Sequence, residues 1–402
     1  MKNLRYTTID GNSKGFLVIL AGLGFFILLG FIAFITMEHE GHHITGMTNQ
    51  VVWGMPHVFA IFLIVAASGA LNVASIASAF NQQFYQPLAR LSAVLALGLL
   101  AGGLAVLLLD LGRPDRLIIA ITYYNFKSIF AWNIILYTGF FGVVGIYLWT
   151  MLDWQVAKFK RIAGIAAFIW RLTLTAGTGS IFGFLVARQA YDAAIMAPMF
   201  IIMSFSFGLA IYLLVLMASY NWTGRELGNA IITRLKNLLG IFIAATLFMT
   251  LIFHMQSLYA TEHHGVEAFI LRDGGIYTQL FWIGQIIIGS IAPLVLVYSP
   301  KFSNNRNFIA LASALVIFGG MVQLYIILIA GQVFPMTLVP GYEATSTFSD
   351  GVIASYSPSQ WEIMLGLGGV AISLLIVAFA LKIFRLLPDS LSDQLTDPHH
   401  KD

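Results

Sequence analysis

The sequence predicts an all-α integral membrane protein with about ten transmembrane helices. Of its 402 residues, 59% are hydrophobic and only 10% are charged, whereas a soluble domain carries about 25% charged residues. Ten segments are long and apolar enough to cross a hydrocarbon layer about 30 Å thick. In chain order they cover residues 16–37, 53–79, 88–111, 129–151, 162–187, 195–219, 238–260, 278–298, 307–330 and 361–384. We therefore expect residues 1–402 to form a single polytopic membrane domain.

The basic residues predict the orientation of these spans. Fifteen of them lie in the two tails and the even-numbered loops: Lys2, Arg5, Lys14, Arg90, Lys158, Lys160, Arg161, Arg225, Arg234, Lys236, Lys301, Arg306, Lys382, Arg385 and Lys401. Five lie in the odd-numbered loops: Arg113, Arg116, Lys127, Arg188 and Arg272. Because loops rich in Lys and Arg stay in the cytoplasm, we expect both termini there, including the tail of residues 385–402. The chain would cross the inner membrane of a bacterium.

The predicted outer loops hold the unusual residues. Residues 38–43 combine three histidines with two glutamates, and a Glu-His-His run begins at Glu262. The ninth loop, residues 331–360, is long and polar, and a loop of that length is usually functional or disordered. We therefore expect the substrate or a partner to meet the protein on its outer side.

A charged turn follows the third span. Residues 109–116 read Leu-Asp-Leu-Gly-Arg-Pro-Asp-Arg. Charge at the edge of the hydrocarbon is costly and is usually retained for a site or a docking surface. Gly112 and Pro114 end the helix, which places Asp110 in its last turn, within reach of the arginines that follow. The alternative is a helix end that is tied by a local ion pair.

Three motifs together resemble the polysulfide reductase membrane-subunit family, also called NrfD/PsrC. They are Trp53-Gly54-Met55-Pro56-His57 at the start of the second span, Asp110-Leu111-Gly112-Arg113-Pro114 after the third, and Asn125-Phe126-Lys127-Ser128 before Trp132. The resemblance is strongest from Glu38 to Asp153. With ten spans in 402 residues, the sequence is most similar to the DsrP-type branch of the family, which serves sulfur metabolism.

The resemblance implies an architecture and a function. It implies two four-helix bundles, built from spans two to five and six to nine, with one flanking helix at each end. The motif-bearing core of the first bundle would cover residues 38–152, and the second bundle residues 195–330. The subunit would bind an exchangeable menaquinone or ubiquinone, without haem, and pass electrons between the quinone pool and a partner.

The partners follow from the same resemblance. We expect an iron–sulfur subunit on the periplasmic side, together with cytochrome, catalytic or c-haem subunits of one complex. The sequence has no cysteine, so the cluster would be held by the partner. Membrane lipid would surround the spans, and no nucleic acid is expected.

His57 and Asp110 are the candidate quinone ligands. They lie at the outer ends of two consecutive antiparallel helices, so we expect them to meet. A quinone site needs an apolar slot and a hydrogen-bonding or protonating group at each carbonyl, and an imidazole with a buried carboxylate supplies such groups. We expect Arg113 to orient Asp110 and to hold it ionised.

Other charged residues near this turn are candidates for docking rather than for a metal. We expect Arg116, Glu38 and Glu40 to contact the partner subunit or lipid headgroups. Imidazole and carboxylate side chains suit zinc or iron, but the spacing within residues 38–43 matches no zinc motif. We therefore expect no metal site.

His254 leaves two alternatives open. It lies in the outer half of the seventh span, at the depth of His57, and two histidines facing each other across a bundle could hold a b-type haem. Alternatively, His254, Glu262 and His263 could form a second site in the second bundle. A redox titration with visible spectra separates the haem alternative from a quinone subunit.

A membrane transporter is the remaining functional class. Arg171 is the one charge deep within a span, and intramembrane ionisable groups often mark ion or proton paths. Other polar residues within spans are Asn72, Asn133, Gln285 and Gln323. The polar residues do not cross the membrane in a row, which weakens this interpretation. Arg171 could equally bind carbonyl groups at an interrupted helix.

Overall fold

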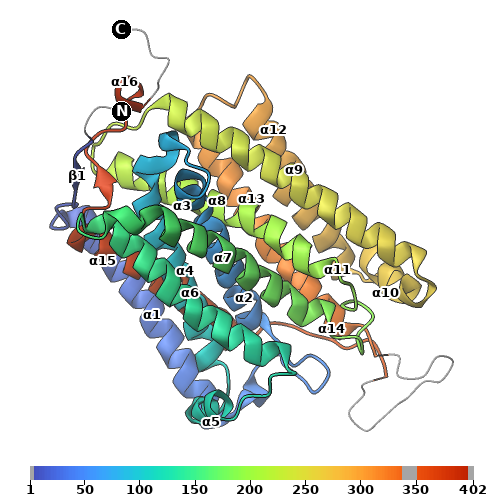
Figure 1. Cartoon of the computed structure of the whole chain (residues 1–402). Coiled ribbons are helices and arrows are strands. Elements are labelled where there is room, and N and C mark those ends of the chain that lie inside the picture. Colours follow the sequence, from blue (N-terminus) through green and yellow to red (C-terminus); the bar gives the residue numbers. More distant parts are fainter. Residues whose placement is uncertain (1–3, 337–350, 397–402) are drawn as a thin grey trace.

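The computed structural model describes residues 4–336 and 351–396, and these contain ten helical spans (Figure 1). The spans cover Lys14–Glu40, Met55–Ser78, Gln83–Leu109, Ile129–Leu152, Ala157–Gly183, Met196–Trp222, Asn229–Tyr259, Ile276–Tyr298, Arg306–Val333 and Gln360–Ile383. The prediction of an all-α protein with ten membrane spans is confirmed.

The first bundle surrounds the second span. Its elements are α2 (Met55–Ala70), α3 (Asn72–Ser78), η2 (Gln83–Leu88), α4 (Ala89–Leu109), α6 (Ile129–Leu152), η4 (Ala157–Phe159) and α7 (Lys160–Gly183). Helix α2 packs along α4, α6 packs along α7, and contacts of α4 with α6 and of α3 with α7 close the bundle. The apolar window of the second span is 89% buried, against 11% for the first span. The second span is therefore at the centre of the molecule.

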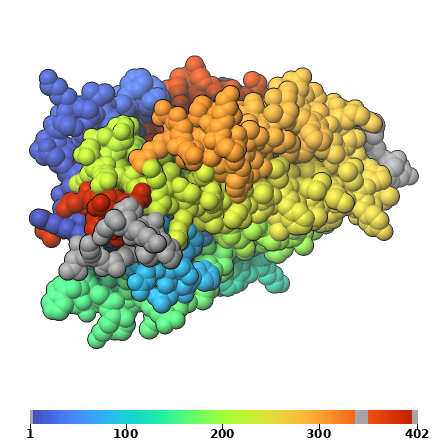
Figure 2. Space-filling model, turned by 90° about the horizontal axis from the view of Figure 1, so that it is seen from above, coloured from blue at the N-terminus to red at the C-terminus, as the bar shows by residue number. Residues whose placement is uncertain are grey.

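The second bundle contains the next four spans. Its elements are α8 (Met196–Trp222), α9 (Asn229–Tyr259), α11 (Ile276–Gln279), η7 (Leu280–Ile291), α12 (Ala292–Tyr298), α13 (Arg306–Tyr325), η8 (Ile326–Ala330) and α14 (Gly331–Val333). Helix α8 packs against α9 and α13, and η7 and α12 pack against both α9 and α13. Figure 2 shows the yellow and orange segments of this bundle as one continuous layer. The segments η7 and η8 are π-helical, which the apolar sequence pattern did not indicate.

The two bundles meet where α2 crosses α8 without intervening side chains. A Cβ atom at Gly69 would lie 1.6 Å from the carbonyl oxygen of Ser204, and one at Gly208 would lie 2.1 Å from the backbone nitrogen of Ala70. Small residues at such a crossing let two membrane helices touch through their backbones. The glycines therefore hold the two bundles in one rigid contact.

The second span is interrupted between α2 and α3. The hydroxyl of Ser92 on α4 donates to the carbonyl of Ala70 and accepts from the backbone N–H of Ala74, at 2.6 and 3.1 Å. A side chain inserted into the helical ladder in this way causes a kink. The interruption lies in the middle of the most buried span.

The two terminal spans lie side by side on one face of the first bundle. Helix α1 (Lys14–Glu40) packs along α15 (Gln360–Ile383), and α15 packs against α4 and α2. The chain ends also meet, because β1 (Tyr6–Thr7) pairs antiparallel with β2 (Leu387–Pro388). This pairing of two residues with two is a small addition to an all-α fold, in which backbone groups of the two tails satisfy each other. The first and last described elements, β1 and α16, lie at the same end of the molecule (Figure 1).

The loops carry short helical elements. They are η1 (His42–Ile44), η3 (Pro114–Arg116), α5 (Leu117–Thr122), η5 (Thr261–His263), α10 (His264–Ala268), the π-helical η6 (Phe269–Asp273) and α16 (Asp393–Thr396). The predicted outer loop of residues 331–360 begins later than expected, because α14 continues the ninth span. Part of that loop, residues 337–350, lies outside the described residues.

Candidate functional site

The charged turn buries one carboxylate and exposes its neighbours. Helix α4 ends at Leu109, and the backbone N–H of Asp110 still bonds to the carbonyl of Val106 at 3.0 Å. Gly112 then adopts a φ of 66°, a conformation that favours glycine. As a result, the Asp110 side chain folds under the turn and is only 1% exposed.

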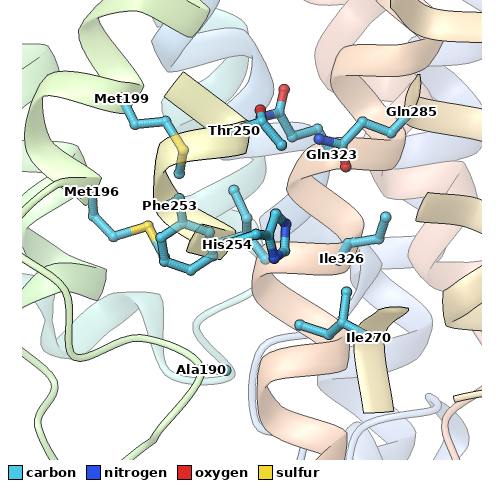
Figure 3. Close-up of a pocket in the computed structure, with 11 residues that line it drawn as sticks. Ala190, Met196, Met199, Thr250, Phe253, His254, Ile270, Gln285, Gln323 and Ile326 are labelled. Carbon is cyan, nitrogen blue, oxygen red and sulfur yellow. The ribbon is translucent and has the colours of Figure 1, made fainter. Parts of the chain in front are cut away.

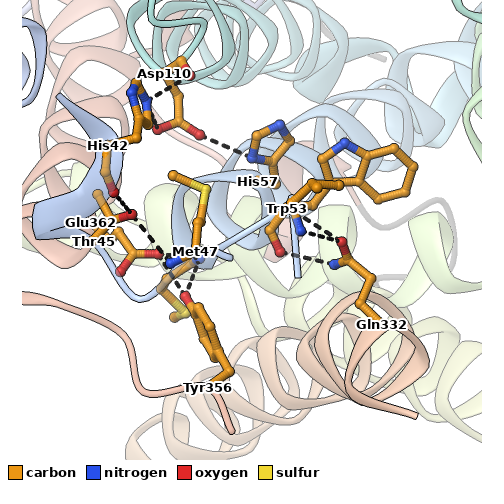
Figure 4. A network of polar contacts seen from close by, with 11 residues as sticks. His42, Thr45, Met47, Trp53, His57, Asp110, Gln332, Tyr356 and Glu362 are labelled. Atoms are coloured by element: carbon orange, nitrogen blue, oxygen red, sulfur yellow. Dashed lines mark hydrogen bonds and ion pairs between the residues drawn. The ribbon is translucent and has the colours of Figure 1, made fainter. Parts of the chain in front are cut away.

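Two histidines face the buried carboxylate (Figure 4). Nδ1 of His57 lies 2.9 Å from Oδ2 of Asp110, and Nε2 of His42 lies 3.7 Å from Oδ1. The His57 and His42 side chains are 19% and 32% exposed, so each can be reached from outside. Neither carboxylate oxygen has a partner aligned for a hydrogen bond, and the same holds for Nδ1 of His57. Nδ1 of His57 is close enough to Oδ2 to be its ion-pair partner, which leaves Oδ1, at 3.7 Å from His42, as the buried oxygen most open to a further group.

The predicted meeting of His57 with Asp110 occurs, but the partner expected for Asp110 was wrong. Arg113 binds Asp115 through two hydrogen bonds of 3.0 Å, and both of these side chains are exposed. Asp115 is two residues away and in solvent, so the guanidinium does not turn back under the helix end. His42 lies where Arg113 was expected. The spacing of residues 38–43 does not distinguish His42 from the neighbouring histidines.

An aromatic cluster encloses the other side of His57. The Trp53 indole stacks on the imidazole, with ring centroids 6.3 Å apart. Phe130, Phe182 and Tyr191 surround the same indole at 5.8 to 6.4 Å. Flat apolar rings beside a polar cluster provide both features that a ring-shaped ligand needs.

Gln332 at the end of the ninth span fixes the Trp53 segment. Its side-chain oxygen accepts from the backbone N–H groups of Val52 and Trp53, and its amide donates to the Trp53 carbonyl. These bonds measure 2.9 to 3.0 Å, and Gln332 is only 1% exposed. Arg188 adds bonds to the carbonyls of Gln50 and Gln332. The second bundle thus positions the entry of α2.

Glu362 holds the same segment from α15. Its carboxylate accepts from the backbone N–H groups of Gly46 and Met55 at 2.9 and 3.2 Å, and from the Tyr356 hydroxyl at 2.7 Å. The side chain is fully buried, and its lone pairs are satisfied within the protein (Figure 4). Glu362 is therefore a positioning residue.

Within the cluster, the pKa of His42 is raised and the pKa of Asp110 is lowered. The contact of His42 with Asp110 raises the pKa of His42 above its ordinary 6.5, although burial lowers it. Burial alone would raise the pKa of Asp110, but the interactions with His42 and His57 outweigh this effect and lower it below 3.8. Asp110 is therefore ionised near neutral pH, and its charge favours a protonated imidazole beside it.

The residues expected to dock a partner lie at the same end of the helices as the Asp110 cluster. Arg116 is exposed beside α5, and Glu38 and Glu40 are exposed on the last turn of α1. The charge of Glu38 contributes to the raised pKa of His42. Helix α5 presents an exposed apolar surface that includes Ile118 and Ile119.

The second bundle holds a separate acid–base pair. Nδ1 of His254 lies 2.8 Å from Oε2 of Glu267, and both side chains are largely buried. The expected grouping of His254 with Glu262 and His263 is wrong in part, because Glu262 is exposed and Glu267, on α10, takes its place. Glu267 was missed because the sequence did not reveal that the chain folds back over α9 after the loop.

A protein-family model matches residues 43–336, under the description polysulphide reductase, NrfD. The chain belongs to the NrfD family. The match includes His57, Asp110 and the acid–base pair of the second bundle. The family is thus established, while the DsrP-type branch stays a prediction.

Relatives of this NrfD protein are subunits of several oxidoreductases. It is 28% identical over 397 residues to the Hdr-like menaquinol oxidoreductase integral membrane subunit of Archaeoglobus fulgidus, covering 98% of this protein and 99% of the relative. It is 24% identical to a subunit of the selenate reductase of Mesobacillus selenatarsenatis, covering 88% and 90%. It is 26% identical to one of the chains of the polysulfide reductase of Wolinella succinogenes, covering 71% and 96%.

Arg171 of this NrfD protein binds at the interrupted helix. It donates to the side-chain oxygen of Asn72 at 2.6 Å and to the carbonyl of Ser68 at 3.4 Å, and it lies over the rings of Phe168 and Phe205. Of the two roles considered for Arg171, the structure favours binding to a carbonyl. Among residues 4–336 and 351–396, no group of three or more His, Cys, Asp or Glu side chains is placed to hold a metal ion.

Proposed function

We propose that the protein is the quinol-exchanging membrane subunit of a multi-subunit oxidoreductase, and that the ring of the quinol binds between His57, Asp110 and Trp53. The observation that carries the proposal is the buried Asp110 carboxylate. It faces two imidazoles, and its oxygens have no donor aligned for a hydrogen bond. The name of the Archaeoglobus relative favours menaquinol over ubiquinol.

The residues present fit a quinol. Oδ1 of Asp110 is buried, lacks an aligned hydrogen-bond donor and lies 3.7 Å from His42, and a ring hydroxyl of the quinol would donate to it. The aromatic rings around Trp53 would border the quinol ring, and the exposed apolar residues Leu108 and Leu111 would lie along the isoprenoid tail. This site is at the surface, where a membrane-soluble ligand can enter.

Oxidation of the quinol would use a proton acceptor and a carboxylate that stabilises the protonated acceptor. A bound quinol supplies two electrons and two protons when it is oxidised. His57 is positioned to accept the two protons one after the other, passing the first on before the second arrives, and the ionised Asp110 stabilises the imidazolium each time. His42, the more exposed imidazole, can exchange a proton with the outer solution.

The electrons released by the quinol need an acceptor in a partner subunit. The sequence has no cysteine to bind a cluster, which supports an iron–sulfur subunit docked over the outer end, beside Arg116, Glu38 and Glu40. Other subunits of the complex would carry the catalytic centre or haem groups. The basic tails and even-numbered loops support a cytoplasmic position for both termini in an inner membrane.

The test uses the assembled complex and two readouts. In His57→Ala and Asp110→Asn, quinol-dependent electron transfer should fall by about 10²-fold or more, since proton acceptors contribute on that scale. Electron transfer from an artificial donor to the partner subunit should stay unchanged. The exposed His43 and Asp115 provide matched controls, His43→Ala and Asp115→Asn.

Two outcomes would contradict the proposal. Normal quinol turnover in both site variants would reject this site. A visible haem spectrum in the purified protein that disappears in His57→Ala or His254→Ala would instead support the b-type haem alternative.

A further inference from the structure

The second bundle buries an acid–base pair that the proposed quinol site does not use. His254 is on α9 and Glu267 is on α10, with 2.8 Å between Nδ1 and Oε2. Their side chains are 11% and 1% exposed. Ionisable groups within membrane helices are costly and mark functional positions by default. Pairing offsets part of that cost, but pairing alone does not explain why His254 lines a cavity.

A small, mostly apolar cavity with a few polar side chains adjoins His254 (Figure 3). Thr250, Gln285 and Gln323 line it together with His254, among apolar neighbours such as Met196 and Met199. The space open to the centre of a water molecule is about 20 Å³, which is room for one water but not for a quinone ring. This pocket therefore does not support a second quinone site.

A second cavity continues the first toward the middle of the membrane. It offers about 10 Å³ by the same measure and shares Gln285 and Gln323 with the first. Ser206, Thr246 and Ser290 supply its remaining hydroxyl groups.

The polar groups form a file along α9. Thr246, Thr250 and His254 follow one another at four-residue spacing, so they share one face, and all three are buried. The Gln323 amide donates to the Thr250 hydroxyl at 3.1 Å, and the hydroxyls of Ser206 and Thr246 are 3.1 Å apart. The file extends about 12 Å along the helix axis.

Three π-helical segments converge on this cavity. Ile270 of η6, Gln285 of η7 and Ile326 of η8 each line it. Such segments are rare and frequently occur at functional sites. Their convergence is an observation independent of the ion pair.

The surroundings of the pair are otherwise uncharged. The lining residues contributed by α8, η7, α13 and η8 are neutral, and Arg188, close to the lining Ala190, is engaged with backbone carbonyls. Tyr277 and Tyr325 stack on each other at 6.2 Å on neighbouring elements. Within the described part of the sequence, Glu267 is the one group that forms an ion pair with His254.

We propose that His254 and Glu267, with one water in the adjoining cavity, form a proton-exchange site in the second bundle. In the exchange, the N–H bond at Nδ1 of His254 breaks and an O–H bond forms at Oε2 of Glu267, which turns the ion pair into a neutral pair. No electrons move. The water, Thr250 and Gln323 continue the file to the second cavity. This inference goes beyond the proposed function, because it concerns protons at a site away from the quinol.

Infrared difference spectra against pH test the site in the purified full-length protein in lipid nanodiscs. Across the pH series, a band of the protonated carboxyl should grow where the imidazolium ring bands shrink, because the proposed transfer exchanges one species for the other. Glu267→Gln should abolish the carboxyl band. Glu262→Gln, an exposed glutamate of the same loop, should retain it.

Labelled wild-type protein keeps the test decisive if Glu267→Gln does not fold. With ring-labelled histidine and labelled glutamate, a histidine band and a carboxyl band should shift in parallel. Gln323→Leu interrupts the file without touching the pair, and it should slow hydrogen–deuterium exchange of the carboxyl band by at least about tenfold. A pair that keeps one protonation state over the whole range, or a band that survives in Glu267→Gln, would overturn the proposal.

Discussion

At the scale of single residues, the Asp110 cluster makes stability depend on pH. The pKa of His42 is raised by Asp110, so its stabilising contribution is present below the ordinary pKa of 6.5 and is lost as pH rises through the raised value. The pKa of Asp110 is lowered, so its contribution is present above 3.8 and is lost as pH falls through the lowered value. We expect the melting temperature to fall as pH rises above neutral.

Asp110→Asn should weaken this pH dependence, because the carboxylate that is the main cause of the raised His42 pKa is then gone. The measurement is the melting temperature of the full-length protein at several pH values. Asp115→Asn, which alters an exposed carboxylate of the same turn, should behave as wild type. An unchanged pH profile in Asp110→Asn would show that His42 does not sense this carboxylate.

The residues of the site differ in how far the sequence predicted them. His57 and Asp110 could be paired because they lie at matching ends of consecutive antiparallel helices. Arg113 could not be placed, because an exposed Asp115 competes for the guanidinium. Glu267 was out of reach, since its position depends on how α10 folds back over α9, a tertiary contact that leaves no periodic pattern.

At the scale of elements, the crossing of α2 and α8 depends on glycine. A methyl group at Gly208 would lie 2.1 Å from backbone atoms of α2. Gly208→Ala should therefore lower the free energy of unfolding by about 1–3 kcal/mol, because a packed backbone cannot move aside. Gly142→Ala on α6 meets nothing within 4 Å and should stabilise the helix by about 0.5–1 kcal/mol. Thermal unfolding of the two variants compares them directly.

Gln332 links the ninth span to the segment before α2. Gln332→Leu leaves the part-buried N–H groups of Val52 and Trp53 without their acceptor, which should cost about 1–3 kcal/mol. Since Trp53 stacks on His57, the KM for quinol should rise as well. Gln279→Leu replaces an exposed glutamine and serves as the control. A normal KM with lowered stability would separate the structural role of Gln332 from the positioning of Trp53.

At the scale of the whole molecule, the sequence predicted the number and position of the spans because length and hydropathy determine them. It did not predict the interruption at Leu71 or the π-helical segments, since both arise from contacts between helices, such as the Ser92 hydroxyl between Ala70 and Ala74. The pairing of β1 with β2 was likewise invisible, because two residues carry no strand signal.

The orientation in the membrane is the remaining property of the whole molecule, and the pairing of the two tails bears on it. Because β1 and β2 pair, the two ends must lie on one side, and the basic residues of the tails predict that this side is the cytoplasm. A reporter fused after Asp10 should therefore report the cytoplasm, and one inserted after Ser355, before α15, should report the outer side. The Asp110 cluster would then face outward, where the partner is expected. The opposite pattern would place the cluster on the cytoplasmic side and would require a cytoplasmic electron-transfer partner, whereas finding both reporters on one side would contradict the ten-span fold itself.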